Sequence, residues 1–178
     1  MWEENEMNEF RNDNDIVYII QQITKICGDS PGKKVLQKMV FLMIQKGINL
    51  PYEYGLHFYG PYSATLDRET DFLCADGIIN IEHSEYTHRL KINSEVEVSP
   101  STLSTKQIEE VKSLIQHFAD MSPSDLELLT TAIYAYNHLE DKSENSVKNG
   151  VVKIKGSKYS PNEIINIFNH FSYFKKAI

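Results

Sequence analysis

The spacing of hydrophobic residues changes along the first half of the chain, and this change constrains the fold more than any other feature. From Ile16 to Met43 the apolar residues recur with the period of an amphipathic helix. From Tyr52 to Phe58 they alternate with other residues, which is the period of a strand. Helical spacing returns after Ser63. The sequence therefore predicts an α+β fold in which helices and short strands follow one another.

Capping residues set the expected limits of the first two helices. The first helix is expected to begin at Asp15 and to end at Gly28. The second is expected to begin with Ser30 as cap and Pro31 at the first helical position, and to end at Gly47. Its apolar surface is wider than one stripe, which predicts that it is the most buried helix.

A strand over residues 52–59 is expected to follow, and Gly60-Pro61 is expected to end it. Ser63 can cap a third helix that ends at Asp76-Gly77 and carries its apolar side chains inward. Residues 79–92 then have the pattern of a β-hairpin with a turn near Ser84. In that hairpin we expect Ile79 and Ile81 to lie opposite Leu90 and Ile92.

The C-terminal half has mostly helical signals. Ser104 and Gln107 form a capping box, and two Ser-Pro pairs, at residues 122–123 and 160–161, predict two further helix starts. Between these, residues 151–159 look like a short basic strand. The predicted architecture is a winged-helix-like N-terminal half, residues 15–98 (two helices, a strand, a helix and a β-hairpin), packed with a C-terminal helical part, residues 104–178. Residues 15–178 are expected to form a single domain, preceded by a mobile acidic leader over residues 1–14.

Composition excludes several classes of protein. The 178 residues carry a net charge of −7 at pH 7, whereas proteins that grip phosphate backbones are usually basic. No apolar run reaches the length of a membrane span. The acidic start lacks the basic-then-apolar order of a secretory signal, so a cytoplasmic protein with no membrane partner is expected.

No motif predicts catalysis. The stretch "GDSPGKK" is too short for a phosphate-binding loop and follows a helix where a strand is required. The histidines have no metal-ligand spacing, and no serine or cysteine has the surroundings of an activated nucleophile. We therefore expect no catalytic residue, no metal and no cofactor, and hence no enzyme.

Two segments resemble a known family. The stretches "KKVLQKMVFLMIQKG" and "YEYGLHFYGPYSATLDRETDFLCADGII" are similar to the YwgA-like family of small bacterial proteins. That resemblance extends from residue 16 to the C-terminus and includes "SDLELLTTAIYAYNHL". Residues 16–92 resemble, more distantly, the Panacea (SocA-like) antitoxin domain. The resemblance implies a toxin–antitoxin or defence setting in which the chain acts by binding a partner protein.

The helix after "GPYS" is acidic on its expected solvent face, where Asp67, Glu69, Asp71 and Asp76 accompany Arg68 alone. Those carboxylates would be repelled by DNA phosphates within a Debye length of about 8 Å. The turn at residues 60–63, here called the corner, leads into this helix. We therefore expect the corner and the residues around it to bind a protein partner, because they include the residue types favoured at interfaces. The predicted partner-binding residues are Tyr59, Tyr62 and Arg68, although a purely architectural role for the corner is the alternative.

A second hypothesis is a winged-helix DNA-binding transcriptional regulator. Its nucleic-acid contacts would come from Lys33, Lys34, Lys38, Arg89 and Lys91. The later lysines 153, 155 and 158 could add to this surface, but the sequence alone does not place them beside it.

Overall fold

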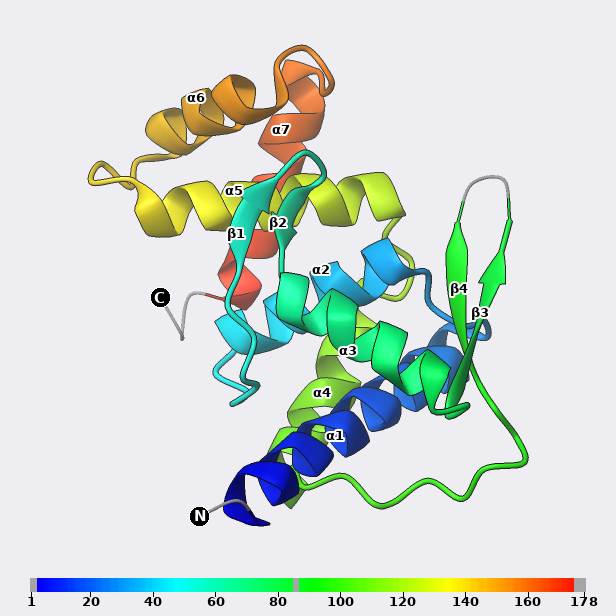
Figure 1. The fold of residues 1–178 in the computed structure, drawn as a ribbon. Coiled ribbons are helices and arrows are strands. Elements are labelled where there is room, and N and C mark those ends of the chain that lie inside the picture. The colour runs from blue at the N-terminus through cyan, green and yellow to red at the C-terminus, as the bar shows by residue number, and fades with distance from the viewer. Residues whose placement is uncertain (1–2, 85–86, 175–178) are drawn as a thin grey trace.

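The computed structural model describes residues 3–84 and 87–174 and confirms the α+β class (Figure 1). Within these residues there are seven α-helices, one 3-10 helix and two antiparallel two-stranded sheets. The elements are α1 (Glu3–Cys27), α2 (Lys33–Gln45), β1 (Gly55–His57), β2 (Gly60–Tyr62), α3 (Ala64–Ala75), β3 (Ile79–His83), β4 (His88–Ile92), α4 (Thr105–Phe118), α5 (Pro123–His138), α6 (Glu144–Lys155), α7 (Pro161–Ile167) and η1 (Phe168–Tyr173). None of these helices combines the length and the hydropathy needed to cross a bilayer.

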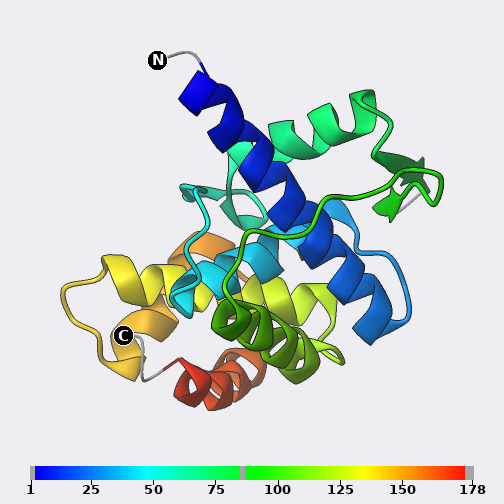
Figure 2. The ribbon, with the colours of Figure 1, turned by 90° about the horizontal axis from the view of Figure 1, so that it is seen from below.

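Helix α2 occupies the centre of the molecule, with α5 on one side and α1 and α3 on the other (Figure 1). Every residue from Leu36 to Met43 is buried, which makes eight of the 13 residues of α2 against nine of 16 in α5, so by this share α2 is the most buried of the expected helices. This run includes two polar residues, Gln37 and Lys38. Helix α1 packs against α4, as the view from below shows (Figure 2), so buried side chains of both halves belong to one hydrophobic cluster.

The hairpin of β3 and β4 has the predicted register. Ile79 pairs with Ile92, and Ile81 pairs with Leu90. The hydroxyl of Ser84 donates to the carbonyl of Thr87 at 3.0 Å, next to the predicted turn. The two residues between them, 85 and 86, lie outside the described residues.

Helix α1 begins before the predicted cap. It starts at Glu3, so Asp15 lies inside the helix. The Asp15 carboxylate instead accepts hydrogen bonds from the hydroxyls of Ser101 and Thr102 and from the Thr102 amide, at 2.6–2.8 Å. The predicted mobility of residues 1–14 stays a prediction, and residues 1 and 2 lie outside the described residues.

The predicted start of the second helix was wrong. Helix α2 begins at Lys33 with Gly32 as its cap. Pro31 lies before the helix, because the Pro31 carbonyl accepts a hydrogen bond from the Leu90 amide and Gly32 forms a bridge to Arg89. The other two Ser-Pro starts, at α5 and α7, are confirmed.

The short strand predicted over residues 151–159 was also wrong. Residues 144–155 form helix α6, which Ser143 caps. Val147 and Val151 are buried one helical turn apart, and Gly150 lets the helix approach α5 so closely that an added Cβ would lie 3.3 Å from Ala135. Packing against α5 thus outweighs the strand preference of the valines.

The predicted strand over residues 52–59 is shorter than expected. Only Gly55–His57 form β1, and the Gly60–Tyr62 segment does not end the sheet but forms its second strand. In the register, Leu56 faces Pro61 and His57 faces Gly60.

Candidate functional site

Buried polar contacts fix the corner at residues 60–63 onto α2. The Gln37 side chain donates to the Ser63 carbonyl and accepts from the Ser63 amide, both at 2.9 Å. The Lys38 Nζ donates to the Pro61 carbonyl at 2.6 Å. Ser63 also caps α3 by accepting from the Leu66 amide. The corner therefore sets the orientation of α3, because it is hydrogen-bonded to Gln37 and Lys38, two consecutive polar residues of α2.

Gly60 brings the same corner against α5. Its φ is +85°, in the region that favours glycine. A Cβ at this position would lie 2.7 Å from the Thr131 Oγ1, which is itself buried. Both the backbone conformation and the contact with α5 thus require a glycine here.

A pocket of about 220 Å³ lies between the corner and the start of α2. It is lined by Lys33, Lys34, Gln37, Lys38, His57, Tyr59, Tyr62 and Asp67. The pocket joins two sets of residues that were predicted separately, the partner-binding tyrosines 59 and 62 and the three lysines assigned to nucleic acid. We call this the corner pocket.

The lysines of the corner pocket differ in their surroundings. Lys33 is paired with Asp67 and Asp71 of α3, at 3.2 Å and 2.6 Å. The Nζ of Lys34 lies 3.7 Å from the ring centroid of Tyr59, in a cation–π contact. The acidic face of α3 is therefore partly neutralised by α2 instead of being free in solvent.

Lys38 is the buried cation of the pocket. Only 4% of its surface is exposed. Burial lowers the pKa of Lys38 to about 8, although the charge of Glu127 acts in the opposite direction. At neutral pH the side chain still carries its proton.

A second charged network lies next to the corner and was missed in the sequence. The Glu127 Oε1 accepts from the Nζ of Lys155 at 2.6 Å and from that of Lys158 at 2.7 Å. Glu127 and Lys155 are buried, with side chains 9% and 4% exposed. Lys155 also donates to the Phe58 carbonyl at 3.0 Å, which ties α6 to the turn of the β1–β2 hairpin.

One signal could have identified Glu127. It lies between Leu126 and Leu128 in a helix whose apolar residues occupy more than one face. A charged residue in such a helix is expected to be buried and therefore to need cationic partners. The sequence pattern assigned the lysines of residues 153–158 to a strand, whereas helix α6 places Lys155 against Glu127.

The remaining predicted residues lie outside the lining of the corner pocket. Arg68 is exposed on α3. Arg89 pairs with Asp29 and donates to the Ser30 carbonyl. Lys91 pairs with Glu82 on the neighbouring strand, at 3.1 Å. The five residues of the nucleic-acid hypothesis are thus divided between the corner pocket and the β3–β4 hairpin.

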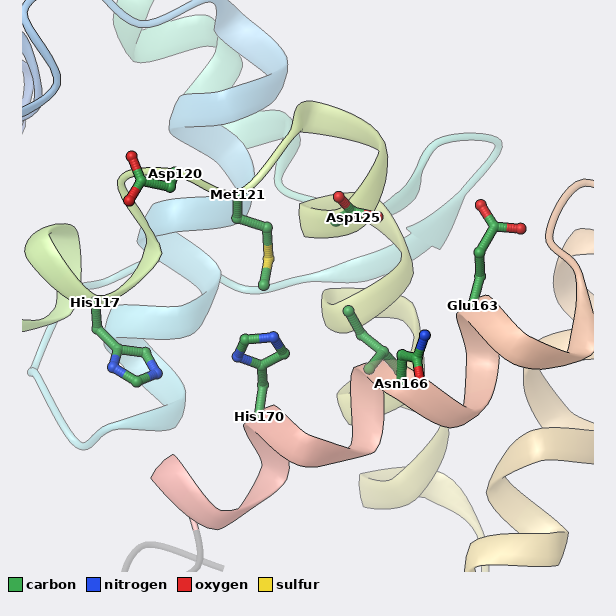
Figure 3. A pocket seen from close by; sticks show the side chains of 8 residues that line it. His117, Asp120, Met121, Asp125, Glu163, Asn166 and His170 are labelled. Atoms are coloured by element: carbon green, nitrogen blue, oxygen red, sulfur yellow. The ribbon is translucent and has the colours of Figure 1, made fainter.

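A larger hollow of about 390 Å³ lies between α4, α5 and the α7–η1 segment (Figure 3). In this view the carboxylates of Asp120, Asp125 and Glu163 converge neither on His170 nor on one another. Two of them are engaged in helix caps, since Asp125 accepts from the Ser122 hydroxyl and Glu163 from Ser160. Within residues 3–84 and 87–174 no group of His, Cys, Asp and Glu is arranged to hold a metal ion. We therefore take the corner pocket as the candidate site.

The comparison with known proteins gives a family. No protein-family model matches the chain. The chain is 30% identical over 141 residues to the "Uncharacterized protein YwgA" of Bacillus subtilis (strain 168). The matched part covers 76% of this chain and 81% of YwgA. The chain therefore belongs to the YwgA family.

Proposed function

We propose that the chain is a non-enzymatic interaction module that binds a partner protein through the corner. The observation that carries this proposal is the exposure of large apolar side chains on the β1–β2 hairpin. Phe58 is 80% exposed, and Leu56 and Tyr59 are 44% and 42% exposed. Exposed apolar side chains that are adjacent, on a rigid element, are typical of protein interaction sites.

The interaction surface is defined by Leu56, Phe58, Tyr59, Tyr62 and Arg68. The rings of Phe58 and Tyr59 are in edge contact, with centroids 5.1 Å apart. The hairpin is held from below by the bonds of Lys38 and Lys155 to its carbonyl groups. Such a prearranged surface loses little conformational entropy on binding.

Charge supports a partner segment that combines apolar and acidic residues. The Nζ of Lys34 and that of Lys158 lie 3.7 Å and 5.9 Å from the Tyr59 ring centroid. Lysines around an exposed aromatic group favour carboxylates at the edge of the contact, where they steer association. We propose that this partner is a toxin or a defence component, because residues 16–92 resemble the Panacea antitoxin domain.

The test is capture of the partner by the purified chain, followed by reconstitution. A partner that co-purifies from the native host is identified by mass spectrometry and then produced separately. Phe58→Ser and the double change Tyr62→Ala with Arg68→Ala should each weaken binding at least about tenfold. Ile165→Ser is the matched control, since Ile165 is 47% exposed on α7, outside the defined surface. Equal binding by all variants, with unchanged circular dichroism, would reject the corner as the interface.

The DNA-binding regulator is tested in the same preparation. Lys33, Arg89 and Lys91 each have a carboxylate partner, which reduces the charge available to phosphates. DNA binding predicts an affinity that falls steeply between low and physiological salt in a gel-shift series. Binding only to protein predicts little DNA binding at either salt concentration.

A further inference from the structure

The buried ammonium group of Lys38 has fewer partners than it can take. A lysine ammonium group has three N–H donors. The Pro61 carbonyl is the acceptor that the structure gives it, and no carboxylate in the described part of the chain lies within ion-pair distance. Glu127 acts on Lys38 through its charge, but its Oε1 already accepts from Lys155 and Lys158.

Buried charges in proteins are normally paired. Lys38 is only 4% exposed and lines the corner pocket. Lys34, which lines the same pocket, faces a ring rather than a carboxylate. The side of the pocket formed by α2 thus carries positive charge that the described chain does not pair with an acid of its own.

The other walls of the pocket are formed by aromatic residues and by Asp67, whose carboxylate is paired with Lys33. The rings of His57 and Tyr62 lie with centroids 5.1 Å apart, and Tyr59 completes the lining. The volume of about 220 Å³ is below the roughly 300–1,000 Å³ of sites for drug-sized ligands. It suits a small molecule with a flat apolar body.

We propose that the corner pocket binds a small organic anion, in which a carboxylate or phosphate meets Lys38 and Lys34 and a flat apolar body lies against Tyr59 and Tyr62. The pocket shares Lys34, Tyr59 and Tyr62 with the surface proposed for the protein partner, but binding of the ligand to the chain alone does not require that partner. Carboxylate and phosphate share the feature that the site recognises, an oxyanion at the end of a compact apolar group.

Calorimetric titration of the full chain at constant ionic strength tests the proposal. The probes are benzoate and phenyl phosphate, with neutral benzamide and inorganic phosphate as comparisons. We expect saturable binding of at least one organic anion with a Kd of about 1 mM or lower, and binding at least about tenfold weaker for benzamide and for inorganic phosphate. Whichever of benzoate and phenyl phosphate binds more tightly identifies the preferred oxyanion.

Variants place the binding in the pocket. Lys38→Met should weaken binding of the organic anion at least about tenfold, and Lys34→Met, which changes an exposed residue, should weaken it as well. Lys91→Met removes one positive charge from β4 and should leave binding unchanged. If benzamide or inorganic phosphate binds as tightly as the organic anions, or if both pocket variants bind like the parent chain, the proposal is wrong.

Protonation gives an independent readout. The charged and titratable groups around Lys38 are Lys33, Lys34, His57, Tyr59, Tyr62, Asp67, Glu127, Lys155 and Lys158. Burial lowers the pKa of Lys38 to about 8, so this lysine loses its charge before an ordinary lysine does. Benzoate affinity should therefore fall as the pH rises from 7 to 9, and this fall should be absent in Lys38→Met.

Discussion

The two β-hairpins have the same topology but are stabilised in different ways. The β3–β4 hairpin has an apolar face, from which Ile79 and Leu90 enter the core, and its charged residues form ion pairs at the surface. The β1–β2 hairpin exposes large apolar side chains, and its carbonyl groups are held from below by buried lysines. The β3–β4 hairpin thus depends mainly on its own apolar pattern, whereas the β1–β2 hairpin depends on lysines of α2 and α6.

The largest loss in the free energy of unfolding is expected for Glu127→Gln, in the network that is bonded to the β1–β2 hairpin. The change leaves two lysine ammonium groups, one of them buried, without their carboxylate. Removing one partner of a buried ion pair costs about 3–5 kcal/mol, so urea unfolding should show a loss of that size. Glu110→Gln, in an exposed pair with Lys106, is the control and should change stability by less than about 1 kcal/mol. A similar small loss for both variants would mean that the Glu127 network does not support the β1–β2 hairpin.

Gly60→Ala is expected to have the next largest effect. The added methyl group would meet Thr131 and would force alanine into a positive φ, at a cost of about 2 kcal/mol. Gly55→Ala on the paired strand is the matched control, because nothing lies within 4 Å of its added Cβ and its φ is not positive. Thermal unfolding of the two variants separates the corner contact from a general effect of glycine replacement.

The pH dependence of stability distinguishes the two hairpins further. The pKa of Lys38 is about 8 in the folded chain, whereas the ordinary pKa of a lysine side chain is 10.5. The unfolded chain therefore binds more protons between these values, and the contribution of Lys38 to stability increases as the pH rises from 8 to 10.5. Against Lys38→Met, the parent chain should gain about 1 kcal/mol per pH unit in this window, measured by urea unfolding at several pH values across it. If the unfolding free energies of the two proteins change in parallel with pH, the pKa of Lys38 is not lowered in the folded chain and the prediction is wrong.

The smallest effect is expected in the β3–β4 hairpin. Lys91→Ala removes a pair with Glu82 in which both side chains are more than half exposed. Such pairs contribute about 0–1 kcal/mol and are screened by salt. The unfolding midpoint should change little, and any change should vanish at high salt. A loss as large as that of Glu127→Gln would remove the distinction between the hairpins.

The sequence predicted those parts of the fold that depend on local periodicity and capping. The register of β3 and β4, the cap of Ser63 and the capping box of Ser104 follow from residues close together in the chain. The start of α2 was wrong because the Pro31 carbonyl bonds to a distant strand. The strand predicted near Val151 was wrong because Gly150 allows α6 to pack closely against α5, and this packing outweighs the strand preference of the valines.

The candidate site was predicted only in part, for the same physical reason. Tyr59 and Lys34 were selected for their residue types, and the structure brings their side chains into contact. The network of Glu127 brings together residues of two helices that are 28 positions apart. No local sequence pattern predicts such a pair. The ion pairs of Lys33 with Asp67 and Asp71 of α3 could not be predicted for the same reason.

The contact of Asp15 with Thr102 also determines how the two halves are joined. The segment between Asn93 and Ser104 is fastened at both ends, since the Asn93 side chain donates to the Gly77 carbonyl and Thr102 is bound to α1. We therefore expect that a cut near residues 95–98 would leave two fragments that stay associated through these contacts and the shared hydrophobic cluster.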